Sequence, residues 1–365
     1  MKITLNQAEN EKLIEYFKQN DRNFEASNQY NSFLTECYDY FTADDVRKCQ
    51  ADGSDEETAL SSLFYSFVQY NDENDDDGLV RYCDFGHFRI LDEKEFLSNP
   101  YLKIVKFKDS KFRGCSLLHN YYAPFELFPY QGTETLDGYR ELSPIGCFRT
   151  KVPYVILTDG TDNIWMSITP YEVNTMKRSI EEAAGNVLTF GLGLGYFAFM
   201  AAQKKEVKSV TIVERDSSII ALFKEKILPS FPEKDKITIV KDDAFRRFPE
   251  SGKYDYIFVD IYRAAEDALP FYLKFRKMEE GLHLSHPVSY WIEGSIFALM
   301  RRYLLTFLME QEAELGEAFY KRDTSENGKL MYRLYLYFKD TEINHIEEIE
   351  SLLTDESIRK LAGKL

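Results

Sequence analysis

The pattern of apolar and polar positions divides the chain into a helical start, a short β-rich middle and a long alternating second half. Apolar residues recur at helical spacing within residues 1–70, as at Leu13, Ile14 and Phe17, and predict helices there. Short β-rich runs separated by Gly and Asp turns then predict a small antiparallel unit. Its expected strands are Tyr101–Phe107, Tyr154–Leu157 and Ile164–Ile168.

A helix start follows this unit. Thr169 is suited to cap a helix that has Pro170 at its first position. Glu172, at the third helical position, can return its side chain to the backbone N–H of the cap. We expect this helix to run to about Ala184 and to stop at Gly185.

From Asn186 onward, predicted strands alternate with predicted helices. This alternation predicts an α/β, Rossmann-like, mostly parallel sheet with right-handed crossovers. The expected strands are Val187–Phe190, Ser209–Val213, Lys236–Val240, Tyr254–Asp260 and Val288–Glu293. The expected helices include one to about Lys204, one from Ser217 to about Leu228 and one at Ile296–Glu312.

The end of the chain carries two further signals. The runs Ala318–Arg322 and Leu330–Phe338 flank an Asn327–Gly328 turn signal and predict a C-terminal antiparallel hairpin. An amphipathic helical tail is expected over 343–365. Together the patterns predict four regions, which are helical at 1–100, β-rich at 101–168, Rossmann-like at 169–342 and a helical tail at 343–365.

Charge is spread unevenly over these regions. The 365 residues carry a net charge of −16, with 44% hydrophobic and 29% charged residues, which is typical of a globular protein. Residues 1–100 contribute −13 of this charge, from 22 acidic and 9 basic residues. Nucleic-acid affinity comes largely from Lys and Arg that neutralise phosphates, so this acidity argues against a nucleic-acid partner.

Cysteine usage and apolar runs give expectations about the compartment. The five cysteines form no CxxC pair, which favours reduced thiols and a cytoplasmic location. We expect no signal peptide, and no apolar run is long enough for a membrane span. The histidines show no metal-binding spacing, so no metal site is expected. The segment Glu73–Asp84 fits an EF-hand only in part and favours a solvated charge run.

A glycine-rich turn is the main chemical signal. After a predicted strand, Gly191, Gly193 and Gly195 alternate with leucines and lead into a helix. Without Cβ atoms, these glycines permit a tight turn and let a ligand pack against the backbone beside a helix N-terminus. The next strand ends at Glu214, 19 residues after Gly195, where a carboxylate can accept ribose hydroxyls. The plain alternative is a glycine-rich turn without a ligand.

Two more acids stand at strand ends in the same predicted sheet. Asp243 follows the third strand and Asp260 ends the fourth. In open α/β sheets ligands bind at the carboxyl ends of the strands, so these acids would face the same crevice as Glu214. Asp242 is either part of this set or an ordinary turn residue.

This set of motifs resembles the class I S-adenosylmethionine-dependent methyltransferases, and within them the spermidine-synthase-like branch, over about residues 165–340. The resemblance implies that Phe190–Gly195 passes under the methionine part of S-adenosylmethionine and that Glu214 holds the ribose. It further implies that Asp243 and Ala244 border the adenine, with Asp243 near its exocyclic amine. Asp260 would then lie near the sulfonium or the substrate.

The chain departs from that family at three places. Thr189 stands where the family usually has an acid near the amino group of the cofactor, and Arg215 stands where it usually has an apolar residue. The aminopropyltransferases carry a second aspartate after the strand-four acid, whereas this chain has Asp260-Ile-Tyr-Arg. The resemblance therefore favours methyl transfer over polyamine synthesis.

The sequence thus predicts a methyltransferase that moves a methyl group to an unidentified acceptor, a small molecule or a protein. Asp260, with Tyr262 beside it, would orient or deprotonate the acceptor. The alternatives are an aminopropyltransferase, a cofactor-binding or assembly protein without activity, and an NAD enzyme, since Gly193 to Ala198 also satisfies GxGxxA. No membrane partner is expected, and a homodimer is considered.

Overall fold

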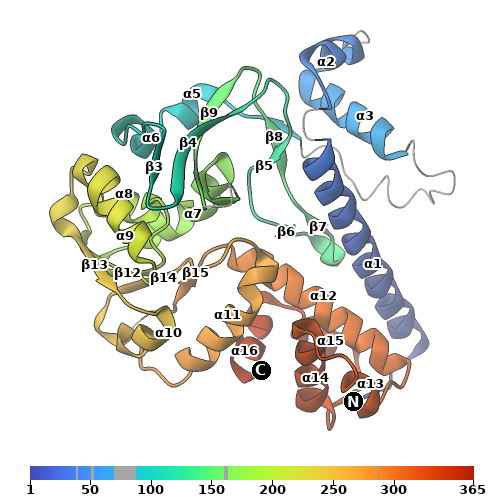
Figure 1. The fold of residues 1–365 in the computed structure, drawn as a ribbon. Helices are drawn as coiled ribbons and strands as arrows, with labels where there is room; N and C mark the ends of the chain where they lie inside the picture. The colour runs from blue at the N-terminus through green and yellow to red at the C-terminus, as the bar shows by residue number, and fades with distance from the viewer. Residues whose placement is uncertain (38–39, 51–52, 70–87, 160–162, 285) are drawn as a thin grey trace.

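A parallel sheet of five strands organises the second half of the described chain (Figure 1). The computed structural model describes residues 1–37, 40–50, 53–69, 88–159, 163–284 and 286–365. The strands follow the order β13-β12-β11-β14-β15, and every neighbouring pair is parallel. Their bounds are Gly185–Phe190 for β11, Val207–Glu214 for β12, Ile237–Lys241 for β13, Tyr256–Val259 for β14 and Ser289–Tyr290 for β15. The predicted parallel sheet is confirmed.

The strand order reverses at the centre of this sheet. From β11 the chain adds β12 and β13 on one side, and then β14 and β15 on the other. In open α/β sheets the crevice outside the carboxyl ends of the strands, at such a reversal, is where ligands bind. The strands are apolar along most of their length because helices cover the sheet, and Val210 and Ile212 are fully buried.

Helices connect the strands as the alternation predicted. The helix expected over 217–228 begins as α9 and continues as a π turn at Phe223–Ile227. The bounds of the connecting helices are Pro170–Glu182 for α7, Tyr196–Ala202 for α8, Ser217–Leu222 for α9, Ala244–Arg247 for α10 and Ala265–Glu279 for α11.

The start of α7 is confirmed only in part. The Thr169 hydroxyl accepts a hydrogen bond from the backbone N–H of Glu172 at 3.4 Å, and Pro170 is the first helical residue. Among the described hydrogen bonds, the backbone N–H of Thr169 does not donate to the Glu172 carboxylate. This half of the prediction is therefore wrong. The Glu172 side chain is instead partly buried.

The predicted C-terminal hairpin is wrong, because both of its runs are helical. They form α13 (Glu317–Tyr320) and α14 (Glu326–Phe338). Leu330 and Leu334 are four residues apart, as on one face of a helix, and both are buried. Gly328, expected at a hairpin tip, lies in the first turn of α14, and its N–H donates to the Ser325 hydroxyl at 3.0 Å.

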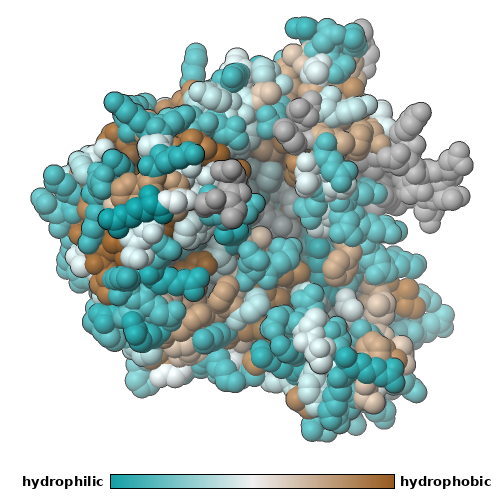
Figure 2. Space-filling model, viewed as in Figure 1, coloured by the Kyte–Doolittle hydropathy of each residue, from teal (hydrophilic) through white to brown (hydrophobic). Residues whose placement is uncertain are grey.

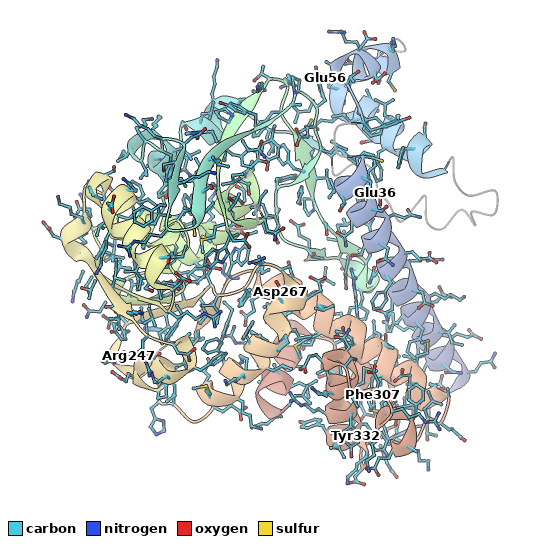
Figure 3. All side chains as sticks on the ribbon, viewed as in Figure 1. Glu36, Glu56, Arg247, Asp267, Phe307 and Tyr332 are labelled. Atoms are coloured by element: carbon cyan, nitrogen blue, oxygen red, sulfur yellow. The ribbon has the colours of Figure 1, made fainter. Side chains whose placement is uncertain are left out.

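The fifth strand is shorter than expected. After the two residues of β15 the backbone takes a left-handed conformation at Ile292 (φ 48°), and α12 (Glu293–Glu312) begins. Phe307 of α12, labelled in Figure 3, is fully buried and its ring packs against Tyr320 and Phe338. The C-terminal helices thus form a helical layer of their own.

The first half contains helices and a small antiparallel sheet, as predicted (Figure 1). Its longer helices are α1 (Gln7–Glu36), α2 (Ala43–Cys49) and α3 (Glu56–Gln69). The sheet has the order β10-β9-β4-β3. Its strands are Ile164–Ile168 for β10, Val152–Thr158 for β9, Cys115–Tyr122 for β4 and Ser110–Phe112 for β3. The remaining short elements are β2 (Arg89–Ile90), α5 (Glu93–Leu97), β5 (Phe128–Pro129), β6 (Glu134–Thr135), β7 (Glu141–Leu142) and β8 (Ile145–Cys147).

The predicted strand Tyr101–Phe107 is wrong. The chain forms the short helix α6 (Pro100–Ile104) there. The Asn99 side chain accepts a hydrogen bond from the backbone N–H of Tyr101, and Pro100 takes the first helical position. This local capping outweighs the β propensity of the aromatic and branched residues that follow.

The two ends of the chain lie together. Strand β1 (Lys2–Ile3) pairs in parallel with β16 (Glu342–Ile343). The expected helical tail forms α15 (Ile346–Leu352) and α16 (Asp355–Lys364). The division of the chain into four regions stays a prediction.

A buried ion pair joins α12 to the first half. Arg302 donates from Nε to Oε2 of Glu141 at 2.6 Å, and the Glu141 side chain is only 3% exposed. On the same face of α12, the Asn20 amide of α1 donates to the Thr306 hydroxyl at 3.2 Å. The first half and the C-terminal helices are therefore tied together by polar contacts.

Polar residues cover most of the face viewed in Figure 2, with smaller apolar patches between them. Among the described residues, no helix combines the length and the apolar character that a membrane crossing requires. The segment that fits an EF-hand in part, Glu73–Asp84, lies outside the described residues.

The Arg302–Glu141 pair generates a stability prediction. We expect Arg302→Met to lower the free energy of unfolding by about 3–5 kcal/mol, because it removes the positive charge that faces a buried carboxylate. Urea unfolding followed by circular dichroism measures this loss. Lys18→Met is the control, because Lys18 pairs with Glu15 on the surface, where a pair contributes about 1 kcal/mol or less. Equal losses of unfolding free energy in the two variants would contradict a stabilising role for the buried Arg302–Glu141 pair.

Candidate functional site

The glycine loop joins the carboxyl end of β11 to the start of α8. All three of its glycines have positive φ, at 96° for Gly191, 53° for Gly193 and 80° for Gly195. A Cβ at Gly191 would lie 1.8 Å from the carbonyl oxygen of Asp260, so only glycine fits. A Cβ at Gly193 would meet only Met166 Sδ, at 3.8 Å, within 4 Å. The backbone at Gly193 is therefore open to a ligand.

Side chains from before the sheet support this loop. The Tyr101 hydroxyl donates to the carbonyl oxygen of Leu194, and Tyr101 is fully buried. The Asn99 amide donates to the Tyr196 hydroxyl at 2.9 Å. Sequence reasoning missed both residues, because it placed Tyr101 on a strand. The Asn-Pro pair that starts α6 was the available signal.

Glu214 lies where the sequence predicted, at the carboxyl end of β12 beside the loop. Its Oε2 accepts the Leu192 N–H at 3.2 Å, and its Oε1 accepts the Asp216 N–H at 2.7 Å. An ionised carboxylate has about four lone-pair sites, so two bonds leave capacity for two more donors. The group is thus held in place by the backbone and still able to bind hydroxyls.

Asp243 and Ala244 lie after β13, next along the sheet edge. The Asp243 carboxylate caps α10, accepting the N–H groups of Phe245 at 3.0 Å and Arg246 at 3.1 Å. Ala244 is the first residue of that helix. Asp242 forms an ion pair with Arg246, which favours its alternative interpretation as an ordinary turn residue.

Asp260 directly follows β14, next to the point where the strand order reverses. Its backbone N–H donates to the Phe190 carbonyl at 2.9 Å, which places it against the glycine loop. Burial, and then the charge of Glu214, raise the pKa of the Asp260 carboxyl to about 7. A carboxyl group with this pKa can both hold and release a proton near neutral pH.

Glu172 is a further acid at this place, which sequence reasoning assigned only to a helix cap. Burial, and then the charge of Asp260, raise the pKa of the Glu172 carboxyl well above its usual value. Among the described residues, the carboxylates of Glu172 and Asp260 form no hydrogen bond and no ion pair. The charge of Glu214 thus contributes to the raised pKa of Asp260, and the charge of Asp260 contributes to that of Glu172.

Tyr262 and Phe190 lie beside the crevice but face into the protein. The Tyr262 hydroxyl donates to the Trp291 carbonyl at 2.8 Å, and the two rings stack with centroids 6.1 Å apart. Burial raises the pKa of this hydroxyl well above its usual value. The Phe190 ring is fully buried and packs against Phe248 and Phe275. Both side chains thus support the site by packing.

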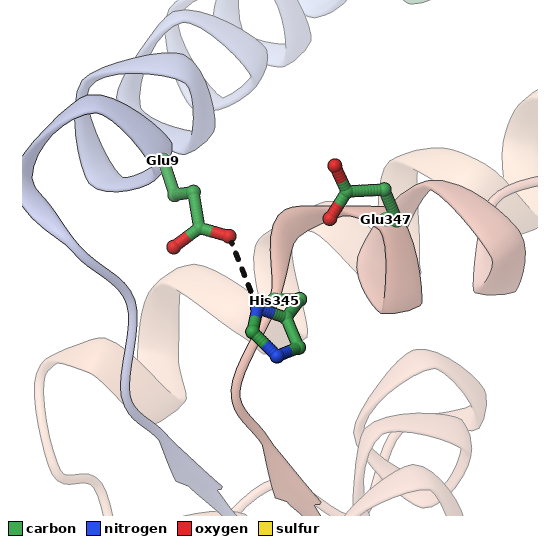
Figure 4. Close-up of side chains that lie close together, drawn as sticks. All are labelled: Glu9, His345 and Glu347. Carbon is green, nitrogen blue, oxygen red and sulfur yellow. Dashed lines mark ion pairs between the residues drawn. The ribbon is translucent and has the colours of Figure 1, made fainter.

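A separate group of possible metal ligands lies where the chain ends meet (Figure 4). His345 Nδ1 is 3.5 Å from Glu9 Oε1, and Glu347 lies nearby. The Glu9 carboxylate accepts the backbone N–H groups of Asn6 at 2.9 Å and Ile346 at 3.2 Å. These bonds cap the starts of α1 and α15, so the group has a structural role there.

A cavity of about 460 Å³ lies between α11, α12 and α14. Leucines such as Leu269, Leu273 and Leu330 line it, together with lysines and Arg333. None of the glycine-loop residues or the three acids lines it. It is therefore a feature apart from the crevice at the carboxyl ends of the strands.

Known proteins show only distant similarity to this chain. No protein-family model and no curated protein matches the chain. Among solved structures, it is similar to a spermidine synthase from Thermotoga maritima, with 14% identity, a TM-score of 0.27 and coverage of 36% of this chain and 49% of that one. A putative O-methyltransferase from Klebsiella pneumoniae shows 20% identity, a TM-score of 0.22 and coverage of 28% and 46%.

A third similar structure is MNMC2 from Aquifex aeolicus, with 16% identity, a TM-score of 0.28 and coverage of 41% of this chain and 60% of that one. The chain thus spans about half the length of the first two of these proteins. Similarities this distant assign no activity.

The raised pKa of Asp260 generates a pH prediction. Its folded-state pKa of about 7 lies above the ordinary value, so the folded protein binds this proton more tightly than the unfolded chain does. Stability from this group is present at low pH and is lost as the pH rises toward 7. Asp260→Asn removes that loss, so we expect it to stabilise the protein at pH 8 by on the order of 3 kcal/mol more than at pH 4. Urea unfolding at both pH values measures the difference, and an equal effect at both would contradict it.

Proposed function

We propose that this protein is an S-adenosylmethionine-dependent methyltransferase that works in the crevice at the carboxyl ends of β11, β12 and β14. One observation carries the proposal. The open backbone of Gly193 lies beside the Glu214 carboxylate, which the Leu192 N–H of the same loop holds in place. A bare loop next to a fixed carboxylate at the strand-order reversal is suited to an adenosine with its ribose hydroxyls.

The donor set of the crevice fits this cofactor. Glu214 would accept the ribose hydroxyls, and Asp243 with Ala244 would border the adenine. The loop Gly191–Gly195 would pass beneath the methionine part, with Asp260 near the sulfonium. When bound, the cofactor supplies a methyl group on a positively charged sulfur, and the carboxylates around the crevice complement that charge.

The work left to the protein is mainly alignment. The leaving thioether is neutral, so holding the acceptor close and in line supplies much of the acceleration. Asp260 is placed to orient the acceptor and, with its pKa of about 7, to take its proton where one must leave. Tyr262 supports this segment through its bond to the Trp291 carbonyl. The acceptor is a small molecule or a protein, since the charge of −16 disfavours nucleic acid.

A thermal-shift comparison tests the cofactor. We expect S-adenosylmethionine and its demethylated product, S-adenosylhomocysteine, to raise Tm, because a ligand that binds only the folded state stabilises it. At 100 times Kd this amounts to about 2.7 kcal/mol. Decarboxylated S-adenosylmethionine and NAD are the comparison ligands. Stabilisation by NAD alone, by the decarboxylated compound alone or by none of the four would overturn the proposal.

A substitution at Glu214 tests the site itself. We expect Glu214→Gln to weaken S-adenosylhomocysteine binding by roughly ten- to a hundredfold, because hydrogen bonds to a charged group contribute about 1.5–3 kcal/mol. Isothermal titration calorimetry measures Kd. Glu225→Gln is the matched control, since Glu225 is exposed and pairs with Lys226. The Tm without ligand reports on folding, and an unchanged Kd in a folded Glu214→Gln variant would remove Glu214 from the site.

A further inference from the structure

The cavity between α11, α12 and α14 has the size and the lining of a small-molecule pocket (Figure 1). Its volume is about 460 Å³, and α12 packs against both of the other helices. Pockets for small molecules usually have volumes of about 300–1,000 Å³ and an apolar lining with a few polar groups. None of the residues proposed to bind the cofactor lines this cavity, so what it binds is independent of the proposed function.

The floor of the cavity is apolar. Leu269 and Leu273 are four residues apart on α11 and so lie on one face of that helix, and Leu330 lines the cavity from α14. Each of these three leucines is only 5% exposed, so the floor lies below the surface of the molecule. Leu299 of α12 adds a partly buried apolar side chain. An apolar chain that entered the cavity would displace water from this floor, which is favourable.

The polar part of the lining is mainly basic, although the whole chain has a net charge of −16. Four lining side chains are basic and two, Glu266 and Glu326, are acidic. The basic side chains come from both helices that flank the floor, and they are Lys274 and Lys277 of α11 and Lys329 and Arg333 of α14. The cavity is therefore a positively charged place on an acidic protein, and its charge favours an anionic ligand.

Two of these four cations are left to bind a ligand. Lys329 pairs with Glu326 at 2.6 Å, and the Lys274 ammonium lies 3.7 Å from the ring centroid of a phenylalanine of α10. In the described parts of the chain, Lys277 and Arg333 form no hydrogen bond and no ion pair. Arg333 is close enough to Glu326 for their charges to interact, but Glu326 is already bonded to Lys329.

We propose that this cavity binds a free single-chain amphiphilic anion, that is, a carboxylate or phosphate group on an unbranched apolar chain. The chain covers the leucine floor, and Lys277 and Arg333 bind the head group. A guanidinium can donate two parallel hydrogen bonds to a carboxylate or a phosphate, and an ammonium adds a compact charge. A purely apolar ligand would leave both cations without an anion, and an inorganic anion would leave the leucines uncovered.

A series of ligands separates the chain from the head group. Decanoate and decyl phosphate carry both, decanol lacks the charge, and acetate lacks the chain. We expect the two amphiphilic anions to bind wild type below their micelle concentrations, and decanol and acetate to bind at least about tenfold more weakly. From hexanoate to decanoate, each added CH₂ group should lower Kd by up to about fourfold, because it is buried on the floor. Isothermal titration calorimetry on the full chain measures these values.

Substitutions of the two cations test the head-group site. We expect Lys277→Gln and Arg333→Gln each to weaken decanoate binding by at least about tenfold and to leave decanol binding within about twofold, because only the charge-assisted bonds are lost. Arg333→Lys keeps the charge and should retain most of the affinity. Lys339→Gln is the matched control, because Lys339 is exposed at the end of α14 and does not line the cavity. All of these side chains are exposed, and the Tm without ligand checks that the variants fold.

Several outcomes would overturn the inference. They are wild type that binds neither amphiphilic anion, decanol that binds as tightly as decanoate, and decanoate binding that both cavity variants leave unchanged or that Lys339→Gln weakens equally. Binding to phosphatidylglycerol vesicles without binding of the free anions would assign a membrane surface instead. A protein that is dimeric in sedimentation velocity, becomes monomeric in Arg333→Gln and binds neither anion would assign a second copy of the chain. None of these measurements uses S-adenosylmethionine, so their failure leaves the proposed function untouched.

Discussion

The close approach of the Gly191 backbone to the carbonyl of Asp260 is the constraint on which the candidate site depends. A Cβ at position 191 would lie 1.8 Å from that oxygen, so the glycine loop reaches across the ends of β11 and β14 only because a side chain is absent. The bond from the Asp260 N–H to the Phe190 carbonyl keeps the two strand ends at this separation. This close approach places Asp260 directly beside the glycine loop, which has no side chain at position 191.

Residues from the first half of the chain also contribute to the candidate site. Tyr101 and Asn99 hold the loop through Leu194 and Tyr196, and Met166 lies beside Gly193. Glu172 enters by the same route, on the helix that follows the small antiparallel sheet. The site is thus assembled from both halves of the chain.

Sequence patterns predicted the parts of the fold that depend on short stretches of the chain. Strands with nearly continuous apolar runs, the loop glycines and the strand-end position of Glu214 were all predicted correctly. The hairpin was wrong, because the turn signal Asn327–Gly328 counted for more than the four-residue spacing from Leu330 to Leu334. The hydrogen bond from Tyr101 to Leu194 could not be predicted, since the two residues are far apart along the chain. Burial in the assembled fold, rather than propensity, decides such side chains.

The pairing of β1 with β16 affects the order in which parts of the chain can fold. Lys2 pairs with Glu342, so this contact spans almost the whole chain. During synthesis β1 is therefore made long before β16, and its hydrogen-bonding groups stay without this partner until β16 has been added. Contacts of such high sequence separation form slowly, because the closure of a long loop precedes any gain from the contact. The strands of the parallel sheet follow one another more closely along the chain, so we expect that sheet to form earlier than the β1–β16 pair.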